Sequence, residues 1–294
     1  MDGKADNERS LTDSLQEYLR GIIGGIMFSL PLIYTMEVWW AGFSLHPFRI
    51  FIYVLATFTL LLGYNNYGGL RYDENRLEVV IDSIEEMGIG LLVSAAFLWL
   101  LGRITADMTW EEIVGKITIE AMTVAIGVSV GTAQLGGGDS NPSSDTEKND
   151  QKQPKGPPCP IQSQGDFWGQ VVISLCGAVL FAANVAPTEE VIMLGIEISS
   201  LKLLGLAIVS IALGSIILFY SNFTGAERFT RSRSLFTIVS GTVINYAIAL
   251  LASAAILWFF GRFDNIALIT AVAQTVVLAL PATLGASAGR LLLQ

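Results

Sequence analysis

The chain has 294 residues, of which 52% are hydrophobic and only 15% are charged, and its mean hydropathy is +0.56. A soluble domain carries about 25% charged residues, so this composition excludes an ordinary soluble enzyme. The net charge of −9 argues against a nucleic-acid partner, because nucleic acid attracts basic patches. One histidine and two cysteines are too few for a haem, zinc or cysteine-rich metal centre, and we expect no cofactor and no enzymatic activity.

Apolar runs of about 20 residues recur along the chain, and each is long enough to cross a bilayer as a helix. They predict an all-α fold, a polytopic transmembrane bundle of eight spans in contact with lipid. The predicted spans cover residues 21–41, 48–64, 78–102, 111–135, 167–188, 199–221, 235–260 and 264–288.

Segments between the spans complete the predicted organisation. Residues 1–20 should form a cytoplasmic N-terminus with a short interfacial helix, because apolar residues recur there at helical spacing. Residues 136–166 are rich in Gly, Ser, Pro, Asp and Lys, which is typical of a flexible linker. The linker would join a first transmembrane repeat at 21–135 to a second at 167–290.

Positive charge predicts the orientation of the spans. The N-terminus, the even-numbered loops and the C-terminus hold 12 Lys and Arg residues, against 5 on the other side. Since Lys and Arg concentrate on the cytoplasmic side of a membrane, both termini should be cytoplasmic.

An internal repeat relates the two halves. Segment 91–103 reads LLVSAAFLWLLGR and segment 250–262 reads LLASAAILWFFGR, with nine of 13 positions identical. The Thr-x-Glu-Val-x-x-x-Gly pattern that begins at Thr35 also recurs from Thr188. Because each half has four predicted spans, both begin on the same side of the membrane. The pattern therefore predicts two parallel repeats related by a pseudo-two-fold axis along the membrane normal.

The repeat retains one pair of acidic residues, Glu37 and Glu190, near the outer ends of their spans. Two facing carboxylates, supported by the Thr35 and Thr188 hydroxyls, would suit a hard cation or a shared proton. This pair is the predicted metal site. Alternatively, both acids lie in the headgroup region or pair with basic residues, for which the candidates are Arg49 and Lys202.

A second group of acids lies deeper in the predicted spans. Asp82, Glu85 and Glu86 share one helical face of the third span, and Glu120 lies inside the fourth. Charge in a span costs about 2.5–3.5 kcal/mol on insertion scales and normally faces a bundle interior or water. Glu37 and Glu120 on the outer side, with Glu86 and Asp82 on the inner side, could form a ladder across the membrane. Glu85 could instead face the headgroups.

The second half has lost this charge, because Asn245 stands at the position of Glu86 and Gln274 at that of Glu120. Asn245, Gln274 and Asn184 could add neutral oxygen ligands to a cation path.

The Thr35-Met-Glu37-Val-Trp39-Trp40-x-Gly42 block, followed by the acidic third span, resembles an uncharacterised family of bacterial multi-pass membrane proteins, a domain of unknown function. The resemblance covers most of the chain outside the linker and the N-terminus. It implies a location in the bacterial cytoplasmic (inner) membrane and no particular activity. The acidic pair on a duplicated scaffold is also similar to cation/proton exchangers, but the chain lacks the aspartate of their Glu-x-Gly-Asp motif.

These patterns favour membrane transport of cations, by a channel or a proton- or cation-coupled transporter, through an acidic path at the repeat interface. Carboxylates suit Ca²⁺, Mn²⁺, Na⁺ or H⁺, and the pattern does not choose among them. The alternative is a non-transporting membrane scaffold or sensor that recruits a partner through the linker. Glycine-rich helix faces also make a homo-oligomer plausible.

Overall fold

The computed structural model describes residues 11–68, 76–135, 162–220 and 235–292, and these residues form ten helices. The helices are α1 (Leu11–Ile33), α2 (Met36–Ser44), α3 (Pro47–Gly68), α4 (Arg76–Leu100), α5 (Trp110–Leu135), α6 (Gln162–Val185), α7 (Glu189–Glu197), α8 (Ser200–Tyr220), α9 (Leu235–Phe259) and α10 (Leu268–Leu292). The predicted all-helical membrane fold is confirmed.

Seven of these helices are long and apolar enough to cross a membrane, or up to eight if the bent pair α1–α2 counts as one span. The predicted boundaries agree with the long helices to within a few residues, except at the first span, which bends between α1 and α2. The eighth span and the two-fold axis between the halves stay predictions.

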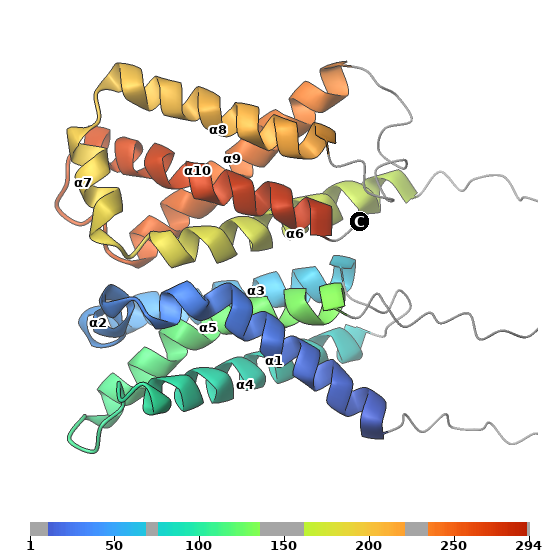
Figure 1. Ribbon diagram of the computed structural model, residues 1–294, viewed down its shortest axis with the longest axis vertical. Coiled ribbons are helices and arrows are strands. Elements are labelled where there is room, and N and C mark those ends of the chain that lie inside the picture. The colour runs from blue at the N-terminus through green and yellow to red at the C-terminus, as the bar shows by residue number, and fades with distance from the viewer. Residues whose placement is uncertain (1–10, 69–75, 136–161, 221–234, 293–294) are drawn as a thin grey trace, which may run out of the picture.

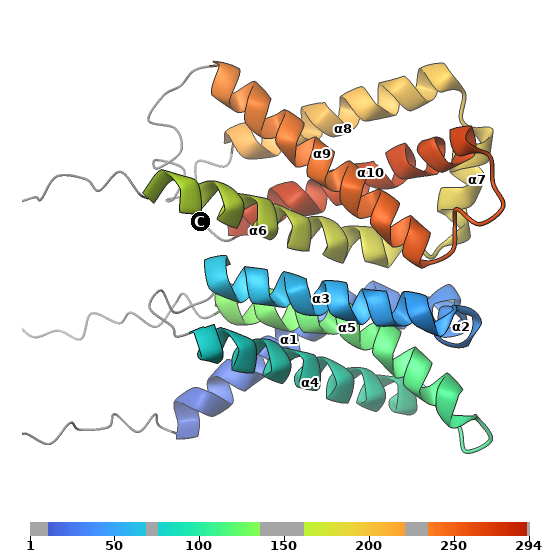
Figure 2. The same ribbon diagram turned by 180° about the vertical axis from the view of Figure 1, so that it is seen from behind.

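Two layers make up the molecule (Figures 1 and 2). Helices α1–α5 form one half and α6–α10 the other, and the halves lie side by side. Within the first half α5 packs against α1, α2, α3 and α4, while in the second α10 packs against α6, α7, α8 and α9. Each half is therefore built around its last helix, and the short helices α2 and α7 lie together at one end of the bundle, which we call the α2/α7 end.

The repeated 13-residue blocks end α4 and α9 with the same cap. Gly102 (φ +67°) and Gly261 (φ +72°) both take the left-handed conformation that favours glycine. The Arg103 amide donates to the Leu98 carbonyl at 2.8 Å, and the Arg262 amide donates to the Leu257 carbonyl at 2.9 Å. These bonds define a Schellman motif, so the sequence identity of the blocks corresponds to an identical local structure.

Small residues set the spacing of the central helix pairs. Gly131 of α5 lies against Gly24 of α1, and Gly285 of α10 lies against Gly177 of α6. A methyl group at any of these positions would meet the backbone of the partner helix, so only glycine allows this approach. Close packing at paired glycines therefore occurs in both halves.

The first predicted span ends earlier than expected, because α1 ends at Ile33 and α2 turns away from it by 86°. Pro31 lies in the last turn of α1, and Thr35 is extended (φ −90°, ψ 113°) as the residue before α2. The Thr35 hydroxyl donates to the Pro31 carbonyl at 2.7 Å, which satisfies an acceptor that the broken helix leaves open. At its other end α1 is continuous from Leu11, so the described part of the predicted interfacial helix belongs to α1.

The fifth predicted span, residues 167–188, also ends early and is followed by a short helix. Helix α6 ends at Val185, Pro187 follows, and Thr188 is extended before α7. The two repeated Thr-x-Glu-Val blocks therefore form the nine-residue helices α2 and α7 rather than the ends of long spans.

A continuous apolar core joins the two halves. Leu61 and Ile126 of the first half and Leu180 and Leu278 of the second belong to one cluster of buried side chains. Outward side chains such as Leu92 (74% exposed) and Leu201 (81% exposed) are apolar as well. An apolar surface of this kind suits a protein whose solvent is the hydrocarbon of the bilayer.

Candidate functional site

Two acidic side chains lie within the transmembrane part of the first half, Glu86 on α4 and Glu120 on α5. Each comes ten residues after the start of its helix, which is about 15 Å at 1.5 Å per residue. Since α4 and α5 run in opposite directions (Figure 1), the two carboxyls enter the bundle from opposite ends.

Glu120 is completely buried, and neither of its carboxyl oxygens has a hydrogen-bond partner among the described residues. The nearest basic residue along α5 is Lys116, but its ammonium group binds Glu112 at 2.8 Å instead. The Tyr53 hydroxyl of α3 lies within electrostatic range of Glu120 and shares a 3.1 Å hydrogen bond with Thr123. An ionised carboxylate in this place would carry an uncompensated charge, which is costly in a low-dielectric interior.

Glu86 belongs to a polar cluster formed by α3, α4 and α5. The Asn65 amide nitrogen donates to Glu86 Oε2 at 2.9 Å and to Ser83 Oγ at 3.1 Å. The Ser129 hydroxyl of α5 donates to Asn65 Oδ1 at 2.8 Å. These four residues form what we call the Asn65 cluster, and three helices contribute to it.

The acids that were predicted to act together differ in exposure and in the groups they contact. Glu85 is exposed and accepts a 3.3 Å hydrogen bond from the Tyr18 hydroxyl of α1, so it faces away from the Asn65 cluster. Asp82 is partly buried one turn before Glu86 and interacts with it electrostatically. The acidic group lies within the first half, and not at the repeat interface where the predicted cation path placed it. It borders on the second half at Cys176 of α6, which is within electrostatic range of Glu86.

The predicted outer site has a different character. Glu37 on α2 is partly buried near Arg262 of the second half, and Glu190 on α7 is exposed. The Thr35 and Thr188 hydroxyls each donate to a carbonyl of their own chain segment, so they do not support the two carboxylates. In the part of the chain that the structure describes, no group of three or more His, Cys, Asp or Glu side chains could hold a metal ion. A metal at Glu37 and Glu190 stays a prediction.

Charged groups instead connect the two halves at the α2/α7 end. The Arg49 guanidinium makes a bidentate ion pair with Asp264, at 2.7 and 2.8 Å, and lies 5.5 Å from the Trp258 ring centroid. The ion pair lowers the pKa of Asp264. Arg262 donates to the Pro187 carbonyl, and burial lowers the pKa of its guanidinium while the Glu37 and Glu189 carboxylates oppose that shift.

The second half carries amides where the first carries acids. Asn245 is completely buried, and its amide donates to Ser287 Oγ at 2.9 Å while Oδ1 has no partner among the described residues. In the described part of the chain, the Oε1 of buried Gln274 has no partner, as is true of the two oxygens of Glu120. Ser94 and Ser253 occupy the same place in the repeated 13-residue block, and both are buried with hydroxyls that the described residues leave unpartnered. Unsatisfied polar atoms therefore occur at corresponding positions of both halves.

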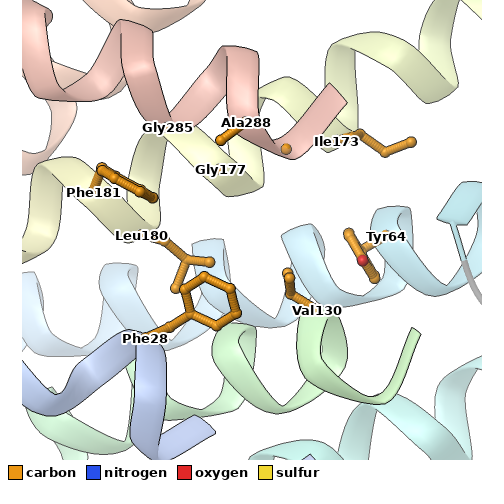
Figure 3. Close-up of a pocket in the computed structure, with 10 residues that line it drawn as sticks. Phe28, Tyr64, Val130, Ile173, Gly177, Leu180, Phe181, Gly285 and Ala288 are labelled. Carbon is orange, nitrogen blue, oxygen red and sulfur yellow. The ribbon is translucent and has the colours of Figure 1, made fainter. Parts of the chain in front are cut away.

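A narrow cleft lies between the halves (Figure 3). Phe28, Tyr64 and Val130 line it from the first half, and Leu180 and Phe181 are among the residues that line it from the second. Its lining is almost entirely apolar, and it has room for about one water molecule. The cleft at this interface therefore lacks the carboxylates that the predicted path requires.

Three residues of the Asn65 cluster were not predicted as site residues: Asn65, Ser83 and Ser129. Asn65 stands between Tyr64 and Asn66, which match Tyr220 and Asn222 of the second half, but its own position is occupied there by a serine. The contacts that define its role join residues 18, 21 and 64 positions apart, which a sequence pattern does not reveal.

The helical fold, its apolar outer surface and its buried carboxyls define a multi-pass integral membrane protein. The family described as "putative integral membrane protein (DUF2391)" matches residues 17–293, and the chain belongs to this family. This confirms the resemblance to a membrane-protein family of unknown function. Searches of the curated proteins and of the solved structures found no match.

Proposed function

We propose that the protein transports a cation or protons across the membrane, and that Glu120 and Glu86 of the first half carry the transported ion. The observation that carries this proposal is the complete burial of Glu120 with both carboxyl oxygens unpartnered in the described residues. A carboxyl group in that environment is stable when it holds a proton or a bound cation, and both can be released.

The positions of the two carboxyls support a path through the first half. Glu86 is reached from the end at which α4 begins, and Glu120 from the α2/α7 end, where α5 begins. An ion that moves between them would travel along α5, past the polar side chains of Tyr53, Thr123 and Ser129. The apolar cleft between the halves offers no comparable ligands.

The surroundings of the outer acids give them a separate role in this proposal. Glu37 lies beside Arg262, so it stabilises the closed α2/α7 end rather than binding the ion in transit. We place that end outside and both termini in the cytoplasm, on the evidence of the Lys and Arg distribution. The start of α1 and the end of α10 lie at the same end of the bundle, which supports a common side for both (Figure 1).

The test is cation flux in proteoliposomes that contain the purified protein. Ca²⁺, Mn²⁺, Na⁺, K⁺ and H⁺ would each be measured with and without a pH gradient. We expect Glu120→Gln and Glu86→Gln to reduce flux of the transported ion about 100-fold or more, in the range of other lost proton-transfer groups. Glu197→Gln, at an exposed position of α7, is the matched control and should transport as the wild type does.

The Glu120→Gln variant should remain folded, because Gln274 occupies the corresponding buried position in the second half. Unchanged flux in both buried variants, or no flux of any ion by folded wild-type protein, would overturn the proposal. The scaffold alternative depends on the linker at 136–166, of which residues 136–161 lie outside the described part of the chain.

A further inference from the structure

The Asn65 amide occupies a position where oxygen acceptors converge. Its nitrogen lies 2.9 Å from Glu86 Oε2 and 3.1 Å from Ser83 Oγ. A single NH₂ group therefore satisfies two oxygens of α4 from the neighbouring helix α3.

The hydrogen bonds around Asn65 determine which way its amide points. Ser83 uses its own proton to donate to the Val79 carbonyl at 2.7 Å, so its oxygen can only accept from Asn65. Ser129 donates to Asn65 Oδ1 at 2.8 Å, which places the amide oxygen on the side of α5. The nitrogen must then face Glu86 and Ser83, because a carboxylate accepts and does not donate.

A small cation could take the place of this NH₂ group. Carboxylate, hydroxyl and amide oxygens are the hard ligands that Na⁺-like and other hard cations prefer. If the Asn65 amide rotated, its Oδ1 would join Glu86 and Ser83, and the hydroxyl of Ser129 would be released to turn an oxygen lone pair inward.

The charge of the Asn65 cluster matches a monovalent ion. Glu86 is the one carboxylate that the described hydrogen bonds place in the cluster. Asp82 and Glu85 are its charged neighbours on α4, and Tyr64 of α3 and Cys176 of α6 face it as uncharged groups. The buried Tyr64 hydroxyl has no partner in the described residues and is a further oxygen within electrostatic range of Glu86.

We propose that Glu86, Ser83, Ser129 and Asn65 form a binding site for a dehydrated monovalent cation of the Na⁺ class, in which the Asn65 amide holds the site closed until the ion displaces its nitrogen. This inference deepens the proposed transport function and rests on it for the role of Glu86. The described part of the second half lacks the carboxylate of this site, because Asn245 stands at the position of Glu86 and donates to Ser287.

The experiment is equilibrium binding of radioactive sodium to the purified full-length protein in detergent, with unlabelled Na⁺, Li⁺ and K⁺ as competitors. We expect one sodium per chain in the wild type, loss of binding in Glu86→Gln, and about 10- to 100-fold weaker binding in Ser83→Ala and Asn65→Ala. Asn66→Ala is the matched control, since Asn66 is the exposed neighbour of Asn65, and should bind as the wild type does. Thermal unfolding of each variant would confirm that it is folded.

Wild-type protein without displaceable sodium, or binding unchanged in either Ser83→Ala or Asn65→Ala, would overturn the site. The outcome is separate from that of the flux test. Sodium binding without flux would leave the site standing and remove the transport function. Proton flux without sodium binding would leave the transport function standing and remove the sodium site.

Discussion

The two halves of the molecule have the same order of helices but different buried polar groups. The helix caps at Gly102 and Gly261 match, and so do the glycine contacts of α1 with α5 and of α6 with α10. At the depth of Glu86 and Glu120, in contrast, the second half has Asn245 and Gln274.

This difference separates the requirements of folding from those of function. Features that hold helices together occur in both halves, because each half must pack its own bundle. The carboxyls occur in one half and cost stability where they are buried, so packing does not explain their presence. The second half thus serves as an internal reference for the first.

The largest expected effect tests the packing that the halves share. Gly131→Leu in α5 and Gly285→Leu in α10 would each force a large side chain against the backbone of the partner helix. Overpacking of this kind costs about 1–3 kcal/mol or more, so both variants should lower the thermal unfolding midpoint in detergent by a similar amount.

Two glycines without close neighbours provide the controls. Gly88 of α4 and Gly205 of α8 have no atom within 4 Å of an added methyl group, so leucine at either position should leave the midpoint nearly unchanged. A large loss for Gly131→Leu with none for Gly285→Leu would show that the halves do not depend on the same contact.

An intermediate effect is expected for a contact that joins the two halves. The Asn184 side chain of α6 accepts from the Leu32 amide at 3.0 Å and donates to the Phe28 carbonyl at 2.9 Å, and so joins the halves beside Pro31. Asn184→Leu would leave these backbone groups without their side-chain partner, at a cost of about 1–3 kcal/mol.

The unfolding midpoint of Asn184→Leu is the measurement, and Ser210→Ala is its control. Ser210 is buried but bonds only the Leu206 carbonyl of its own helix among the bonds described for it. If the two substitutions lowered the midpoint equally, the contact between the halves would contribute no more to stability than a hydrogen bond within one helix.

The smallest expected effect concerns the ion pair at the α2/α7 end. Asp264→Asn removes the partner of Arg49, and exposed pairs contribute about 0.2–1 kcal/mol. We expect a slightly lower unfolding midpoint at low salt and no difference at high salt, where the pair is screened.

The pH dependence of this contribution follows from the sign of the pKa shift. Because Arg49 lowers the pKa of Asp264 below its ordinary 3.8, the stabilisation is present above that value and is lost as pH falls through the lower one. The midpoint difference between wild type and variant should therefore be constant between about pH 5 and pH 8. Asp107, in the corresponding loop of the first half, is the control, because the contacts described for it do not reach the other half. The midpoint difference between wild type and Asp107→Asn should not depend on salt. A salt-insensitive loss in Asp264→Asn would contradict an electrostatic origin.

The long apolar runs were sufficient to predict an all-helical membrane protein, because the cost of exposing backbone and polar groups to hydrocarbon acts on each segment separately. The repeat was equally visible, since a duplicated block such as 91–103 and 250–262 keeps its residues and its helix cap. The acidic positions could likewise be read directly, and Glu86 and Glu120 were among them.

Only the tertiary structure decided which of these acids are buried and what they contact. Glu37 and Glu120 are both acids within apolar surroundings in the sequence, yet one lies beside Arg262 and the other has no partner among the described residues. The bonds of Asn65 to Glu86 and of Asn184 to α1 join residues 21 or more positions apart. Such contacts depend on how whole helices pack against one another, and hydropathy and local spacing carry no information about that packing.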